Sequence, residues 1–233
     1  MSASHSRAHD LTRGDSLVPA WLKQASRAVL NPIVRGALAI GMTANGITVL
    51  GLLVTIAAAI VIASGSLLAG AAVLLAGSVL DAVDGAIARA QGGGTPFGSF
   101  LDSTLDRASE AILYIGVAAF LLRTMPDPLL PVSAVILALA GSFLVSYAHA
   151  RAEGIGLSAS VGLAPRTERL VLIITGIALA GLGWLPGLLG AIGLVAALTV
   201  VTAIQRIWHV YRLTAAAASV PATTDTKENA ERG

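Results

Sequence analysis

Long apolar stretches separated by short polar segments make up most of this chain. Residues 36–80 contain no Asp, Glu, Lys or Arg, and neither do residues 170–205. Each stretch has room for about two helices of roughly 20 residues, the length that crosses the hydrocarbon layer of a bilayer. The pattern therefore predicts an all-α integral membrane protein.

Six transmembrane helices fit between the turn-forming segments, which are rich in Gly and Pro. Before them, residues 17–35 mix apolar side chains with basic ones, as in an amphipathic helix lying in the membrane interface, interrupted at Pro32. The six expected spans cover residues 46–65, 68–90, 103–122, 129–151, 167–184 and 187–210.

The spans belong to one expected domain, residues 36–213, with a polar tail at each end. Residues 1–16 have no apolar core behind their charges, so we expect no cleaved signal peptide there. Residues 214–233 are rich in Ala, Thr and charge, which is typical of a disordered tail.

Charged residues are scarce and lie near the ends of the expected spans. They make up 12% of the chain, whereas a soluble domain is about a quarter charged. Of the fifteen Lys and Arg residues, only Arg123 falls on the side opposite the termini. The positive-inside rule then places both termini and the loops 90–102 and 152–166 in the cytoplasm. The net charge is only +2, and the basic residues lie at span ends; this pattern favours lipid headgroups or anionic substrates over nucleic acid as partners.

Four aspartates lie at the cytoplasmic ends of the second and third expected spans. Asp81 and Asp84 are three residues apart, and Asp102 and Asp106 are four apart, so each pair shares a helix face. The glycine-rich turn at 92–94 brings the two faces together. Carboxylates are costly near a bilayer, so we take these four as functional candidates.

Divalent cations would relieve the repulsion among these carboxylates, because the nearby Arg89 and Arg107 are too few to do so. Carboxylate oxygens favour Mg²⁺ or Mn²⁺, and two such ions can clamp a phosphoryl group. The small Gly85 and Ala88 would let a nucleotide approach the helix, and Arg89 would contact a phosphate. A cation transporter would also carry acids in its spans, but it would usually place them near the bilayer midplane in repeated halves.

This run of residues resembles a family signature. The pattern Asp-x2-Asp-Gly-x2-Ala-Arg-x8-Gly-x3-Asp-x3-Asp, typical of CDP-alcohol phosphotransferases, is complete from Asp81 to Asp106. The resemblance implies a membrane enzyme that cleaves a CDP-linked lipid, transfers its phosphoryl-alcohol part to a hydroxyl and releases CMP. It implies that the four aspartates hold two Mg²⁺ ions, or Mn²⁺, with Asp106 also the general base. The CDP-lipid contacts it implies are Asn45, Gly46, Gly85, Arg89 and Thr95.

The stretches 146–154 and 161–170 resemble the phosphatidylinositol-phosphate synthase branch of that family. This resemblance implies inositol phosphate as the acceptor. Two positions depart from the branch: His149 stands where lysine is expected, which would hold a phosphate less firmly, and Pro165 replaces an acidic residue. The implied acceptor-phosphate contacts are Ser146, His149, Arg166 and Arg206.

Several alternatives stay open at this point. Arg151 and Arg169 fit equally well as headgroup anchors or as substrate contacts. Glycerol phosphate and serine remain possible acceptors, and a divalent-cation transporter is the alternative outside this enzyme class. The resemblance further implies CDP-diacylglycerol as donor, a homodimer among membrane lipids, and a bacterial plasma membrane with the active site facing the cytoplasm.

Overall fold

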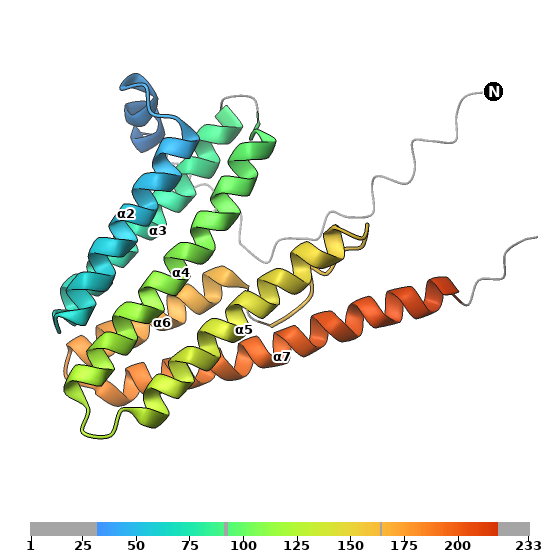
Figure 1. Ribbon diagram of the computed structural model, residues 1–233. Helices are drawn as coiled ribbons and strands as arrows, with labels where there is room; N and C mark the ends of the chain where they lie inside the picture. The colour runs from blue at the N-terminus through green and yellow to red at the C-terminus, as the bar shows by residue number, and fades with distance from the viewer. Residues whose placement is uncertain (1–31, 91–92, 164, 219–233) are drawn as a thin grey trace, which may run out of the picture.

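The computed structural model describes residues 32–90, 93–163 and 165–218, and within these ranges it is helical and contains no strand. The prediction of an all-α fold is confirmed. The long helices are α2 (Ala44–Ala63), α3 (Leu67–Ala90), α4 (Pro96–Thr124), α5 (Leu129–Glu153), α6 (Arg166–Gly181) and α7 (Leu185–Ala218) (Figure 1).

Four of these helices, α2, α3, α5 and α7, are long and apolar enough to cross a membrane. The first half of α4 carries the acidic motif, and α6 has only 16 residues. The expected interfacial helix at 17–35 falls mostly outside the described residues, as do the tails 1–16 and 219–233. A short helical segment over 32–39 precedes α2.

Side-chain caps decide where two of the helices begin. The Thr43 hydroxyl accepts a hydrogen bond from the Gly46 N–H at 3.2 Å and starts α2. Thr95 does the same for the Gly98 N–H at 3.0 Å, with Pro96 in the first turn. As a result α4 begins well before residue 103, where the sequence predicted the third span.

The last helix ends later than the sequence predicted. We expected a disordered tail from residue 214, but α7 continues to Ala218. The reason is the run of alanines at 215–218, because alanine has the highest helix propensity of all residues.

The helices form two groups (Figure 1). In the first, α2 packs against α3 and α4; in the second, α7 packs against α5 and α6. The two groups meet where α3 lies against α6 and α4 lies against α5. Small residues allow the closest approaches: a Cβ on Gly116 of α4 would lie 2.7 Å from the Ala59 carbonyl oxygen of α2. The start of α2, the end of α3 and the start of α4 meet at one end of the bundle, which is where the motif lies.

Candidate active site

The four aspartates lie on the last turns of α3 and the first turns of α4. Asp84 is only 8% exposed, and its Oδ2 accepts a hydrogen bond from the Thr48 hydroxyl of α2 at 2.9 Å. A side chain of α2 therefore orients one of the carboxylates that α3 carries.

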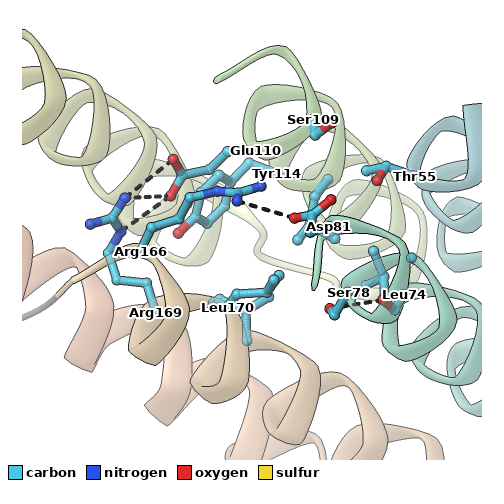
Figure 2. A pocket seen from close by; sticks show the side chains of 13 residues that line it. Thr55, Leu74, Ser78, Asp81, Ser109, Glu110, Tyr114, Arg166, Arg169 and Leu170 are labelled. Carbon is cyan, nitrogen blue, oxygen red and sulfur yellow. Dashed lines mark hydrogen bonds and ion pairs between the residues drawn. The ribbon is translucent and has the colours of Figure 1, made fainter. Parts of the chain in front are cut away.

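Arg166, at the start of α6, bridges the two acidic helices. Its Nη1 lies 3.1 Å from Asp81 Oδ2, and its Nη2 lies 2.9 Å from Asp106 Oδ1 (Figure 2 draws the contact with Asp81). Arg107 adds a longer contact, 3.6 Å from Nη1 to Asp106 Oδ2. The structure thus brings Asp81 and Asp106 together around a guanidinium group.

Asp84 and Asp102 line a different space, a cavity of about 370 Å³ at the end of the first group. Of the five expected CDP-lipid contacts, Asn45, Gly85 and Thr95 line it as well. The first turns of α2 and α4 both border this cavity, so two helix N-termini direct partial positive charge into it. Such a space suits a diphosphate.

The other two expected CDP-lipid contacts lie outside that lining. The Gly46 N–H is used in the Thr43 cap. The Arg89 side chain folds back along α3, with its Nη1 3.4 Å from where a Cβ on Gly85 would stand. Arg89 therefore lies beside Gly85, which is one of the residues that line the cavity.

The donor set fits a hard divalent cation, because it consists of four carboxylates with a hydroxyl orienting one of them. Among the described residues, however, no three acidic or histidine side chains converge into a complete metal site. The sequence led us to expect all four carboxylates at one site. Asp81 and Asp106 contact the guanidinium group of Arg166, whereas Asp84 and Asp102 line the cavity.

The remaining expected acceptor contacts lie on α5 and α7. Arg206 donates from Nε to the Val161 carbonyl at 2.9 Å and from Nη1 to the Val145 carbonyl at 2.7 Å, which ties the segment before α6 to α5. His149 Nε2 lies 3.3 Å from Glu153 Oε1, and Ser146 is half-buried. Of the four candidates, Arg166 is the one that contacts the aspartates.

We did not single out Glu110 and Tyr114 in the sequence, although their spacing could have identified them. They continue the spacing of four residues that begins at Asp102 and Asp106, so they lie on the same face of α4. Tyr114 is buried, and Glu110 pairs with Arg169 of α6 (Figure 2). Because the Arg169 side chain is only 3% exposed, it is not a headgroup anchor.

Comparison with known proteins adds to this geometry. Residues 41–208 match the family model described as CDP-alcohol phosphatidyltransferase. The chain is 45% identical over 142 residues to the archaetidylinositol phosphate synthase of Methanothermobacter thermautotrophicus, covering 61% of this chain and 69% of that protein. It is 37% identical over 172 residues to the phosphatidylinositol phosphate synthase of Mycobacterium bovis, covering 73% and 79%.

Solved structures of a related synthase share the fold. The Mycobacterium tuberculosis phosphatidylinositol phosphate synthase with CDP-DAG bound matches with a TM-score of 0.74 and 36% identity, over 79% of this chain and 94% of that one. Another structure of that synthase, in complex with manganese and citrate, also has a TM-score of 0.74 and 36% identity, over 78% and 88%.

Proposed function

The chain belongs to the CDP-alcohol phosphatidyltransferase family, and we propose that it transfers the phosphatidyl group of CDP-diacylglycerol to the hydroxyl of inositol phosphate. The products are phosphatidylinositol phosphate and CMP. The named relatives support inositol phosphate as the acceptor, and the structure with bound CDP-DAG supports the donor. Membership of an enzyme family sets the cation transporter aside.

The observation that carries this proposal is the position of Arg166 between Asp81 and Asp106. An anionic acceptor needs a cation close to the base that activates its hydroxyl, and arginine matches a phosphate group with two donors. The cavity lined by Asp84 and Asp102 does not include Arg166 in its lining and supports the nucleotide position. Donor and acceptor would therefore contact different members of the four aspartates.

In the proposed reaction, Asp106 accepts the proton of the acceptor hydroxyl. The acceptor oxygen forms a bond to the phosphorus that carries the diacylglycerol, the bond from this phosphorus to the bridging oxygen breaks, and CMP leaves with the electron pair. The first turns of α2 and α4, together with Arg89, would hold the diphosphate. Two divalent ions, Mg²⁺ or Mn²⁺, bound by Asp81, Asp84, Asp102 and Asp106, would supply charge neutralisation at the phosphoryl group.

The same premise extends to the surroundings of the enzyme. We infer that α4 and α6 complete a set of six spans, that the loops bearing the motif face the cytoplasm, and that the protein is a homodimer in a bacterial plasma membrane. The basic residues near the motif end of the bundle support this orientation.

The test is release of CMP by the purified protein from CDP-diacylglycerol, with inositol phosphate, glycerol phosphate or serine supplied in turn. We expect release with inositol phosphate to be fastest by a wide margin. Asp106→Asn is expected to lower that release by about 100-fold or more while CDP-diacylglycerol still binds. Faster release with glycerol phosphate or serine would overturn the acceptor, and full activity of the Asp106 variant would overturn the base.

A further inference from the structure

A buried ion pair joins α4 to α6 one turn beyond the proposed site. Arg169 Nε and Nη2 lie 3.2 and 3.1 Å from Glu110 Oε1, and Nη2 also lies 3.3 Å from Oε2. The two side chains are only 3% and 9% exposed. Figure 2 shows the pair beside Tyr114, with Asp81 further along the same pocket.

Stability alone does not account for such a pair. Taking two charges out of water costs about as much as their attraction returns, and a well-packed apolar pair in the same place is often more stable. Buried charges are better attested as devices that fix the register of packed helices. The question is then which register Glu110 and Arg169 fix.

The spacing along the two helices answers it. Glu110 lies four residues after Asp106 on α4, and Arg169 lies three residues after Arg166 on α6. Two ion pairs therefore join the same helices about one turn apart. We call Asp106–Arg166 the upper bridge and Glu110–Arg169 the lower bridge. Fixing the lower bridge fixes the height and rotation of the Arg166 backbone relative to Asp106.

The two bridges differ in how easily they can open. The Arg166 side chain is 31% exposed and shares its guanidinium group between two helices, so it can exchange a carboxylate for an incoming phosphate. Arg169 is held by both oxygens of one buried carboxylate. The lower bridge therefore stays formed, whereas Arg166 in the upper bridge can change partners.

The cavity proposed for the CDP-lipid does not depend on the lower bridge. The described residues that line the 370 Å³ cavity come from α2, α3, α4 and the turns before α2 and α4, and α6 contributes none of them. A displacement of α6 should therefore weaken the binding of the acceptor more than the binding of the CDP-lipid.

We propose that Glu110 and Arg169 are a positioning pair, which holds α6 so that Arg166 stands at Asp81 and Asp106 and the acceptor phosphate is bound in register with the base. The proposal rests on the function proposed above. It assigns to this pair an effect on the acceptor and none on the binding of the CDP-lipid.

The kinetic test uses Arg169→Gln and Glu110→Gln, with Arg169→Lys as the conservative variant. We expect Arg169→Gln to raise the KM for inositol phosphate and lower kcat/KM on the order of tenfold to a hundredfold, with CDP-diacylglycerol affinity changed less than about twofold. Arg169→Lys should recover part of the loss. The double variant should be no worse than Arg169→Gln alone, because both changes break one interaction.

The matched control is Arg123→Gln. Arg123 also links two helices, since its Nη1 lies 3.3 Å from the Ala63 carbonyl, but it does so at the far end of α4. If the Arg169 variants lose donor and acceptor affinity equally, or lose activity only in proportion to a lowered Tm that the control shares, the pair is merely structural and the proposal fails. Unchanged kinetics in Arg169→Gln would overturn it as well.

A second measurement keeps the two proposals apart. Spin labels on cysteines introduced at the exposed positions Thr104 and Thr167 report the distance between α4 and α6 without any substrate. We expect a narrow distance distribution in the parent protein and a broad or shifted one with Arg169→Gln. A parent protein that releases no CMP with inositol phosphate would refute the proposed function, whereas an unchanged distribution would refute the positioning pair.

Discussion

At the scale of single residues, the four carboxylates of the proposed site share few positively charged side chains. Arg166 donates a charge-assisted hydrogen bond to Asp81 and forms an ion pair with Asp106, and charge-assisted hydrogen bonds are among the stronger polar contacts in proteins. We expect a divalent cation that binds the same carboxylates to displace the guanidinium group from them. Arg166 and the metal would then compete, and the displaced side chain would become available to an acceptor phosphate.

This competition predicts opposite effects of one substitution. Arg166→Met should tighten Mn²⁺ binding by roughly tenfold, about 1.4 kcal/mol, while lowering kcat/KM for inositol phosphate. Calorimetric titration of Mn²⁺ into the purified protein measures the first effect, and CMP release measures the second.

Arg107→Met is the comparison variant. Arg107 contacts Asp106 at the longer distance of 3.6 Å, so its removal should change Mn²⁺ affinity less than the removal of Arg166. Weaker Mn²⁺ binding by Arg166→Met would contradict the competition, because it would make the arginine a support of the metal site.

At the scale of helices, the sequence predicts which helices form better than where they begin and end. It also predicts which residues share a helix face better than which residues meet between helices. The apolar runs predicted every described long helix. The start of α4 was missed because residues 96–102 read as a polar loop until the Thr95 cap is considered. Asp81 to Asp106 followed from spacing along single helices, but the Glu110–Arg169 pair joins residues 59 apart in the chain. Such pairing depends on where the fold places α4 and α6 relative to each other, which no local pattern encodes.

Helix packing gives a prediction for Gly116, which faces the backbone of α2. A Cβ there would lie 2.7 Å from the Ala59 carbonyl oxygen and 2.8 Å from its Cα, so α4 has to move away from α2. We expect Gly116→Ala to destabilise the protein by about 1–3 kcal/mol, which thermal unfolding in detergent would register as a lower Tm.

Gly190 of α7 provides the opposite case. Nothing lies within 4 Å of a Cβ built on it, and alanine is favoured over glycine in a helix by about 1 kcal/mol. Gly190→Ala should therefore leave Tm unchanged or raise it. Equal Tm values for the two alanine variants would mean that α2 and α4 are not in close contact at Gly116.

At the scale of the whole molecule, the two groups of helices carry opposite halves of the chemistry. The segment α2–α4 holds the aspartates and the cavity proposed for the nucleotide. The segment α5–α7 brings the arginines, and Arg166 and Arg169 cross from it to the acids. The interface between the groups is where the reaction is proposed to occur.

Membrane topology gives a prediction that separates six spans from four. If all six long helices cross, positions 66 and 126 lie on one side and position 160 on the other. If only the four most apolar helices cross, positions 126 and 160 exchange sides. The chain has no cysteine, so Ser66→Cys, Pro126→Cys and Ser160→Cys each introduce a single label site.

Labelling with a membrane-impermeant maleimide in intact cells and in inverted vesicles reads out these positions. We expect labels at 66 and 126 only from outside and at 160 only from the cytoplasm. Labelling of 126 from the cytoplasm would rule out a spanning α4.

The division between the two groups has a consequence for how such proteins diversify. The groups are consecutive in the chain and are joined by one short connection, residues 125–128, between α4 and α5. A single genetic crossover in that connection would exchange the whole segment that carries Arg166 and Arg169, while leaving the aspartates and the cavity proposed for the nucleotide untouched. Recombination of this kind would yield a working chimera only where the incoming segment brings a cation that matches Glu110.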